Sequence, residues 1–333
     1  MTQNFIESSL AEVDLTFDVP LRPQSLLDFT GQDAIRERLE VLIEASKQRG
    51  DVLSHCLFSG PPGLGKTTLA NILSKAMGTN LVVTSGPVIE KAGDLAGILT
   101  NLKPGDILFI DELHRLSRVV EEYLYPAMED FSLDLMIDSG PSARSVQVKL
   151  NKFTLVGATT RVGLITAPMR SRFGFTCRLD YYQPQELERI LQRTARILNL
   201  SVDSSGLMEI AQRSRGTPRI ANNLLRWVRD YAQIRTNNQI NKDVVHQALS
   251  MLAIDERGLE EMDKKILSVI IDHYGGGPVG VNTIAVAVGE ESSTIEEVYE
   301  PYLIMEGFLK RTPRGREATL SAYHHLGREF PGN

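Results

Sequence analysis

The sequence lacks the features that mark secreted, membrane-spanning and metal-binding proteins. Cysteine is scarce: Cys56 and Cys177 are the only two, and they form neither a metal-spaced pair nor a disulfide framework. No run of about 18 apolar residues occurs, so we expect no segment that spans a membrane. Residues 1–18 are acidic and lack the basic start and apolar stretch of a signal peptide. These absences favour a protein of the reducing cytoplasm.

A basic excess, which would suit a nucleic-acid-binding protein, is also missing. The net charge is −6, yet the charges are unevenly distributed. Residues 255–306 contain twelve acidic side chains against three basic ones, whereas residues 308–328 contain five basic against one acidic. Such segregation indicates either a solvated patch or a surface that meets a polyanion, and the charges alone favour the solvated patch.

From Leu21 onward, the sequence alternates helical patterns with short β-rich runs. Strands separated by helix-sized connections predict a parallel sheet covered on both faces, which is an α/β architecture. The runs lie at residues 56–60, 80–85, 106–111, 153–160 and 176–180.

Changes of pattern divide the chain into four parts. Residues 1–20 look like a loosely held tail without a recognisable role, and residues 21–181 contain the α/β pattern. Residues 182–254 are helical, with Gly, Asn, Ser and Thr signals between the helices. Residues 255–333 show three helices and then two short strands around a Pro/Gly turn. That order predicts a winged helix.

Residues 132–150 interrupt the α/β pattern. Two runs of alternating apolar and polar residues flank a turn-like stretch, which predicts a β-hairpin inserted between a helix and a strand. The alternating apolar residues are Leu133, Leu135, Ile137, Val146, Val148 and Leu150. The hairpin is either a flap on the domain's own core or a docking surface for a partner, and the residues alone leave both open.

The strongest chemical signal is GPPGLGKT at residues 60–67, which matches the phosphate-binding pattern G-x-x-x-x-G-K-[ST]. A β-rich run precedes it and an apolar-periodic helix follows it. Its glycines allow backbone N–H groups to converge on phosphate oxygens, and the helix N-terminus adds positive potential. We expect Lys66 to reach the β- and γ-phosphates of a nucleotide and the Thr67 hydroxyl to ligate Mg²⁺.

A second signal is ILFIDE at residues 107–112, an apolar strand that ends in two acids. Ligands of open α/β sheets bind at the carboxyl ends of the strands, so we expect these acids beside the phosphate-binding loop. Asp111 is predicted to hold the Mg²⁺ shell. Glu112 is predicted to polarise the attacking water as a general base.

Three further features gain meaning only beside this loop. Thr159, which ends the following strand, either bonds the γ-phosphate or the attacking water, or simply caps the strand. Arg170 and Arg172 are either a solvated pair or supply the cation that a transition state needs from a neighbouring subunit. Arg219 opens a helix of residues 182–254: the motif either only starts that helix, or it presents Arg219 where a second domain could close over the phosphates.

Charge assigns the two halves of the winged-helix region different roles. The last helix carries Glu296, Glu297 and Glu300, which would repel phosphates. The wing carries Lys310, Arg311, Arg314 and Arg316. If this region touches DNA, charge favours the wing over the usual recognition helix.

The histidines are not persuasive as functional residues. His324 and His325 have no acid or cysteine at metal-ligand spacing. His114, in DELH, superficially resembles the motif of DExH helicases, but those enzymes need a second motor domain for which this chain has no room.

Several stretches together resemble the RuvB family of Holliday-junction branch-migration ATPases, within the AAA+ class. The resemblance extends from about residue 20 to residue 320. AAA+ ATPases in general share the phosphate-binding loop, the acidic pair and the arginines. Far more specific to the family are GPVIEKAGDL, YPAMEDF and RTPRGR.

The resemblance implies a homohexameric ring that encircles duplex DNA and pumps it with ATP and Mg²⁺. Two rings flank a four-way junction bound by RuvA, in recombination and repair, and the RuvC resolvase joins them. The hairpin at 132–150 would dock RuvA, and Arg172 would act across the subunit interface, with Arg170 its close alternative. Arg219 would be the sensor of the small domain. Arg311 and Arg316 would contact the DNA backbone.

The resemblance also implies which residues surround the nucleotide. The adenine side would be bordered by Leu21, Arg22 and Tyr182. Phosphate and Mg²⁺ would be held by Gly63, Gly65, Lys66, Thr67 and Thr68. The family's nucleotide environment further includes Glu129, Asp130 and Phe131.

Three other functions share parts of this pattern. A clamp loader has the same ATP residues but ends in a helical collar instead of a basic wing. A nucleotide-gated scaffold with negligible hydrolysis conflicts with the intact Glu112 and the arginines. A protein remodeller predicts ATPase activity stimulated by polypeptide and indifferent to DNA.

Overall fold

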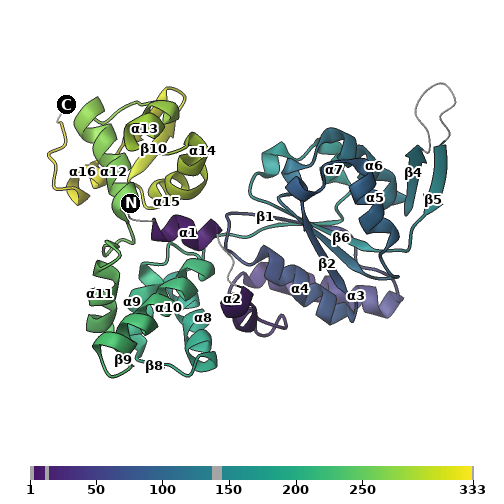
Figure 1. Ribbon diagram of the computed structural model, residues 1–333, viewed down its shortest axis with the longest axis horizontal. Coiled ribbons are helices and arrows are strands. Elements are labelled where there is room, and N and C mark those ends of the chain that lie inside the picture. Colours follow the sequence, from purple (N-terminus) through teal and green to yellow (C-terminus); the bar gives the residue numbers. More distant parts are fainter. Residues whose placement is uncertain (1–3, 12–14, 137–144, 332–333) are drawn as a thin grey trace. The chain divides into compact units, whose positions relative to one another are not determined.

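The computed structural model describes residues 4–11, 15–136 and 145–331, which form two compact units. The first unit consists of residues 15–182. The second consists of residues 183–331 together with residues 4–11. Each unit has its own arrangement of helices and strands (Figure 1) and its own buried hydrophobic cluster.

A sheet of five parallel strands forms the centre of the first unit, in the order β2-β3-β6-β1-β7. The strands are β1 (Cys56–Ser59), β2 (Leu81–Ser85), β3 (Ile107–Asp111), β6 (Thr154–Thr159) and β7 (Phe175–Arg178). They confirm the five predicted runs. All four residues of β1 are buried, as a strand covered on both faces requires. Parallel pairing brings the carboxyl ends of β3, β6 and β1 to one edge, and the functional residues follow these ends.

Helices cover both faces of this sheet, with α3 and α4 on one side and α5, α6 and α7 on the other (Figure 1). Their bounds are α2 (Leu15–Leu21), α3 (Asp33–Arg49), α4 (Lys66–Met77), α5 (Ala92–Thr100), α6 (Arg118–Glu129) and α7 (Ala167–Ser171). Helix α6 illustrates why these segments are helical. Ser117 caps its start by accepting a hydrogen bond from the Val120 N–H, and apolar residues at helical spacing, such as Leu124 and Met128, are buried.

The predicted hairpin is present, built from the antiparallel strands β4 (Ser132–Met136) and β5 (Ser145–Lys149). Ile137 and the turn up to residue 144 lie outside the described residues. Leu133 is fully buried on the core of the unit, whereas 42% of Val146 is exposed. The base of the hairpin therefore belongs to the domain's own core, and part of its apolar surface faces solvent.

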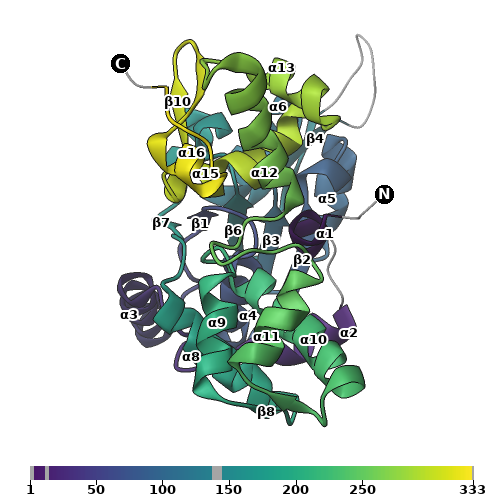
Figure 2. The same ribbon diagram turned by 90° about the vertical axis from the view of Figure 1, so that its left-hand side faces the viewer.

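The second unit contains the predicted helical region and winged helix. The helical region comprises α8 (Pro184–Ile197), α9 (Ser204–Gln212), α10 (Pro218–Arg235) and α11 (Lys242–Ser250), with the two-residue strands β8 (Ser201–Val202) and β9 (Gln239–Ile240). The winged helix comprises α12 (Glu261–Ser268), η4 (Val269–His273), α13 (Val281–Val288), α14 (Ser292–Thr294), η5 (Ile295–Tyr299), α15 (Glu300–Met305), the wing strands β10 (Leu309–Thr312) and β11 (Gly315–Ala318), and α16 (Leu320–His325) (Figure 2). Its core includes the fully buried Ile266, Ile284 and Leu303.

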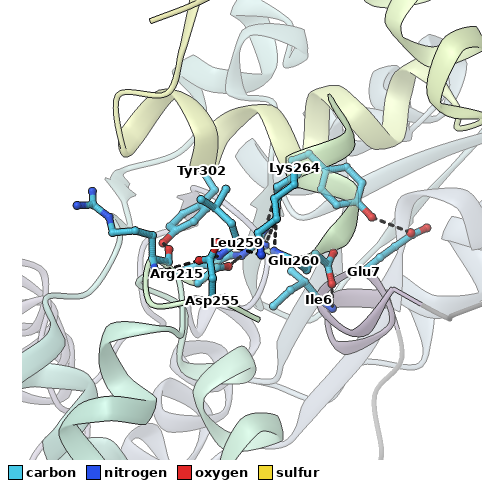
Figure 3. A network of polar contacts seen from close by, with 12 residues as sticks. Ile6, Glu7, Arg215, Asp255, Leu259, Glu260, Lys264 and Tyr302 are labelled. Atoms are coloured by element: carbon cyan, nitrogen blue, oxygen red, sulfur yellow. Dashed lines mark hydrogen bonds and ion pairs between the residues drawn. The ribbon is translucent and has the colours of Figure 1, made fainter. Parts of the chain in front are cut away.

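The expectation of a loosely held N-terminal tail is wrong for the described residues. Helix α1 (Phe5–Ala11) packs against α10, and Ile6 is completely buried. The Ile6 N–H donates to the Glu260 carboxylate at 3.2 Å, and the Tyr299 hydroxyl donates to Glu7 at 3.1 Å (Figure 3). One large apolar side chain and these polar contacts supply the docking energy that composition alone did not reveal.

Candidate functional site

The phosphate-binding loop follows β1 and leads into α4. Gly60, Gly63 and Gly65 have φ values of 135°, 78° and 106°, which favour glycine. Gly60 is also fixed by space, because a Cβ there would lie 2.4 Å from the Leu179 carbonyl oxygen. This backbone forms a concave loop of N–H groups at the start of a 12-residue helix, the arrangement that binds phosphate.

Lys66 lies over this loop. It is only 7% exposed, and its ammonium donates to the carbonyl oxygens of Gly60 and Pro61, each at 2.8 Å. The partly exposed Thr67 and Thr68 follow in the first turn of α4. The ammonium and both hydroxyls are therefore gathered at the helix N-terminus, as predicted for groups that hold phosphates and Mg²⁺.

The acidic pair ends β3, at the same edge of the sheet. The Glu112 N–H donates to Asp111 Oδ1 at 2.9 Å, and Glu112 has a left-handed backbone with φ of 48°. Such a conformation is uncommon for a residue other than glycine and concentrates at functional sites. Gly86, after β2, packs closely against this turn, because a Cβ there would lie 2.4 Å from the Glu112 carbonyl oxygen. The Glu112 side chain is one-third exposed and therefore accessible to a water molecule.

The two threonines at the end of β6 have different surroundings. Thr159 is fully buried, and its hydroxyl contacts His114 Nδ1 at 2.9 Å and accepts from the Arg161 N–H at 3.0 Å. Thr160 is partly exposed, and its hydroxyl lies 3.5 Å from Glu112 Oε2. The geometry thus favours Thr160 over the predicted Thr159 as the hydroxyl that faces phosphate or water. Successive strand residues point in opposite directions, and sequence alone did not show which one faces the site.

His114 is a site residue that sequence reasoning dismissed. Its side chain is 7% exposed and contacts Thr159 through Nδ1, while Nε2 lies 3.4 Å from Glu112 Oε2. The available signal was its position two residues after the predicted base. The sequence did not show that Thr159, 45 residues further on, contacts this histidine, so the position alone did not indicate a role.

Arg172 lies in a separate cluster at the end of α7. It donates to the Pro168 carbonyl at 2.7 Å and to Glu129 at 3.1 Å, and its guanidinium carbon lies 4.3 Å from the centre of the Tyr125 ring. Arg170 is exposed. The structure therefore holds Arg172 in a defined orientation and leaves Arg170 in solvent.

Glu129, Asp130 and Phe131 end α6 and precede the hairpin. Glu129 belongs to the Arg172 cluster, and the exposed Asp130 ends the helix. Phe131 packs against His55 and Phe153, which precede β1 and β6. Because these strand starts lie opposite the phosphate-binding loop, Phe131 does not join the loop of its own subunit.

Tyr182 contacts the phosphate-binding loop directly. It is buried, and its hydroxyl donates to the Leu64 carbonyl at 3.2 Å. Phe29 closes the same side, since a Cβ on Gly65 would lie 3.2 Å from its ring. Leu21 is buried at the end of α2, and the partly exposed Arg22 follows it.

Arg219 lies at the start of α10 in the second unit, and its guanidinium donates to the Leu10 carbonyl of α1 at 2.9 Å. The turn before it is anchored by Arg215, which is buried, ion-paired with Asp263 of α12, and bonded to the Gly258 carbonyl at 2.9 Å (Figure 3). The segment that presents Arg219 is therefore tied to both α1 and the winged helix.

The wing arginines differ in accessibility. Arg316 is 8% exposed and pairs with Glu296 at 2.7 Å and Glu300 at 2.8 Å. The Arg311 side chain is 63% exposed, and its guanidinium lies farther from the same glutamates, at 3.7–3.8 Å. Arg314 is exposed in the turn. The predicted DNA contact by Arg316 conflicts with its burial in this network, because the acidic helix already neutralises it. Arg311 and Arg314 are the arginines that present charge to solvent.

The described residues contain no group of three or more His, Cys, Asp or Glu side chains arranged to hold a metal ion. Mg²⁺ usually binds one or two protein groups together with substrate phosphates and water. The Thr67 hydroxyl and the Asp111 carboxylate are chemically suited to that role. In the part of the chain that the structure describes, no helix has the length and apolarity needed to cross a bilayer.

The fold and site define a P-loop ATPase with a helical lid and a C-terminal winged helix. Family profiles agree: "Holliday junction DNA helicase RuvB P-loop domain" matches residues 21–179, "RuvB AAA lid domain" residues 182–255, and "RuvB C-terminal winged helix domain" residues 256–327. The chain therefore belongs to the RuvB family of Holliday-junction branch-migration motors, which are AAA+ ATPases.

Similar proteins include the Holliday junction branch migration complex subunit RuvB of Protochlamydia amoebophila, 71% identical over 98% of both chains. The subunit of the same name from Chlamydia pneumoniae is 58% identical, over 95% of this chain and 94% of that protein. The solved Thermotoga maritima RuvB Holliday junction branch migration motor superposes with a TM-score of 0.86 at 50% identity, covering 94% of this chain and all of the other.

Proposed function

We propose that this chain acts in the cytoplasm as one subunit of a homohexameric ring that moves duplex DNA through a Holliday junction. The observation that carries the proposal is the convergence of Lys66, Asp111, Glu112 and Thr160 at one edge of the sheet, in a chain that also carries a winged helix. The first feature supplies hydrolysis and the second a means of holding DNA. A clamp loader accounts for the first feature only.

The residues divide the chemistry of hydrolysis as follows. The N–H groups around Gly63 and Gly65 and the Lys66 ammonium bind the phosphates of ATP, while Leu21, Arg22 and Tyr182 border the base. Thr67 and Asp111 would hold Mg²⁺, with Thr68 beside them, and the bound ion would neutralise charge on the phosphates. Glu112 takes a proton from the attacking water at its carboxylate, and Thr160 helps to place that water.

The remaining positive charge comes from a second subunit. Arg172 is proposed to complete the transition-state environment across the subunit interface, and Glu129 supports this by fixing the arginine's orientation. Asp130 and Phe131 are proposed to belong with Glu129 to the nucleotide environment. Arg170 is the alternative, and Arg219 senses the phosphates from the lid.

The hairpin at 132–150 is proposed to dock RuvA. The exposed Val146 supports this, because an apolar side chain on a projecting hairpin suits a partner surface. In the wing, Arg311 and Arg314 are proposed to contact the DNA backbone, whereas Arg316 reaches it only if its pairs with Glu296 and Glu300 open. RuvC is proposed to join this assembly as resolvase.

The decisive test measures ATP hydrolysis with and without duplex DNA, together with junction migration in the presence of RuvA, for the wild type and Glu112→Gln. We expect DNA to raise hydrolysis, and the variant to lose at least about 100-fold in turnover and all junction movement, because the amide cannot accept the proton. Hydrolysis that is indifferent to DNA, with junctions unmoved beside RuvA, would overturn the motor assignment. Stimulation by unfolded polypeptide instead would favour a protein remodeller.

A further inference from the structure

We propose that His114 is a positioning residue that links the buried hydroxyl of Thr159 to the carboxylate of Glu112. Its two ring nitrogens contact these groups at 2.9 Å and 3.4 Å. The inference rests on the proposed role of Glu112 as the base and assigns a function to a histidine that the hydrolysis scheme above does not use.

The chemistry of the contacts fixes the proton on the ring. A bare Nε2 lone pair facing the Glu112 carboxylate would be repulsive, so Nε2 carries the hydrogen and turns it toward Oε2, 3.4 Å away. In the neutral ring Nδ1 is then an acceptor, and Thr159 donates its hydroxyl hydrogen to it. The Thr159 oxygen remains free to accept the N–H of Arg161, which it does at 3.0 Å. Hydrogen bonds therefore run from the Arg161 backbone N–H to Thr159 and from the Thr159 hydroxyl to His114, and the Nε2–H of His114 faces the Glu112 carboxylate at 3.4 Å.

Burial makes the Thr159 end of this series of contacts rigid. Thr159 is fully buried and pairs with Ser59 in the sheet, and the imidazole is 7% exposed. Glu112, in contrast, is one-third exposed on a turn with a left-handed backbone. A fixed imidazole in contact with this partly exposed carboxylate restricts the directions in which the carboxylate points. The 3.4 Å separation exceeds that of a strong hydrogen bond, so the carboxylate keeps the freedom to engage water.

The Thr160 hydroxyl, 3.5 Å from the same carboxylate oxygen, supplies a second contact from the same strand end. Consecutive threonines therefore act on Glu112 by different routes, Thr160 directly and Thr159 through the imidazole. This explains why a fully buried hydroxyl contributes to the site without facing the phosphates.

Three substitutions of His114 in the full-length chain separate its contact with Glu112 from its contact with Thr159. His114→Gln retains an N–H donor near the position of Nε2, His114→Asn retains a polar group near Nδ1, and His114→Leu removes both. The exposed His324→Gln is the matched control. For each variant we would measure kcat and KM for ATP hydrolysis, the Kd for ATP and the thermal midpoint.

We expect His114→Leu and His114→Asn to lower kcat roughly 10- to 100-fold, the range for losing a hydrogen bond to a charged group, with the Kd for ATP within about twofold of wild type. His114→Gln should recover most of kcat, and His324→Gln should match the wild type. A role confined to folding would lower the thermal midpoint in parallel with kcat and would not favour Gln over Asn.

Double substitutions test whether Thr159 and His114 act on Glu112 through the same series of contacts. If Thr159 acts through His114, the Thr159→Val and His114→Leu losses in kcat should not multiply when combined. Multiplying losses, wild-type turnover in His114→Leu, or Gln no better than Leu would each overturn the link. If Glu112 is not the base, Glu112→Gln would hydrolyse ATP normally. If only the proposed role of His114 is wrong, Glu112→Gln would still be inactive.

Discussion

At the residue scale, environment decides what each side chain does here. Glu260 has the same chemistry as any surface glutamate, yet it is 3% exposed beside Asp263 and accepts the N–H of Ile6. Burial raises the pKa of Glu260 to about 7, although Arg215 draws it downward and Asp263 adds to the rise. The carboxyl is therefore protonated in the folded protein at pH values where it is ionised in the unfolded chain.

The consequence is a pH-dependent loss of stability. Because the folded pKa lies above the ordinary 4.5, the folded state holds its proton more tightly, and stability falls as pH rises from about 4.5 through 7. Glu260→Gln removes this titration and keeps an acceptor for Ile6. We expect the stability of the variant relative to wild type to rise by about 2–3 kcal/mol from pH 5 to pH 8.

Urea unfolding at the two pH values measures this difference. The exposed Glu256→Gln is the matched control and should show the pH response of the wild type. An equal response in Glu260→Gln and wild type would show that the buried carboxyl does not titrate in this range.

At the scale of elements, α1 joins the helical region to the winged helix through few residues. Ile6→Ala should free this helix, because the side chain is completely buried and its loss removes roughly 2–4 kcal/mol of packing in a core setting. Hydrogen exchange of the amides of residues 5–11 should then rise toward the unfolded rate. Val286→Ala, at an 85% exposed position of the same unit, should leave that exchange unchanged. Protected amides in Ile6→Ala would show that polar contacts alone hold α1.

Elements with strong periodicity or strict turn chemistry were predictable from sequence. The five sheet strands, the four lid helices, the hairpin and the wing all lie where their patterns placed them. Lys66 and Glu112 were equally predictable, because a strand-ending acid pair has a specific meaning when it occurs together with a glycine-rich phosphate-binding loop. Docking of α1, burial of Arg316 and the contacts of His114 depend on residues distant in sequence. Local patterns carry no information on such contacts, and the structure alone reveals them.

At the scale of the whole molecule, a ring in which Arg172 acts across the interface makes a prediction that no single chain can. Arg172→Ala and Glu112→Gln rings should each be nearly inactive. Rings formed from equal amounts of both chains should regain roughly one quarter of wild-type hydrolysis, since about one interface in four then joins an intact arginine to an intact glutamate.

Steady-state turnover of such mixtures, combined before assembly, distinguishes the alternatives. An arginine acting within its own subunit gives no recovery at any ratio. Arg170→Ala in place of Arg172→Ala identifies the residue, because only the variant of the true donor is inactive alone and complements Glu112→Gln.

The hairpin also has a mechanical meaning. Its first strand begins three residues after Glu129, and its second leads through residues 150–153 into β6, which ends at Thr159. A pull on the hairpin is therefore transmitted along the chain to the end of α6 that orients Arg172 and to the strand that carries Thr159. A partner that pulls on this hairpin would act on the Arg172 cluster and on the end of β6 at the same time. Resistance to DNA movement would then change the rate of ATP hydrolysis.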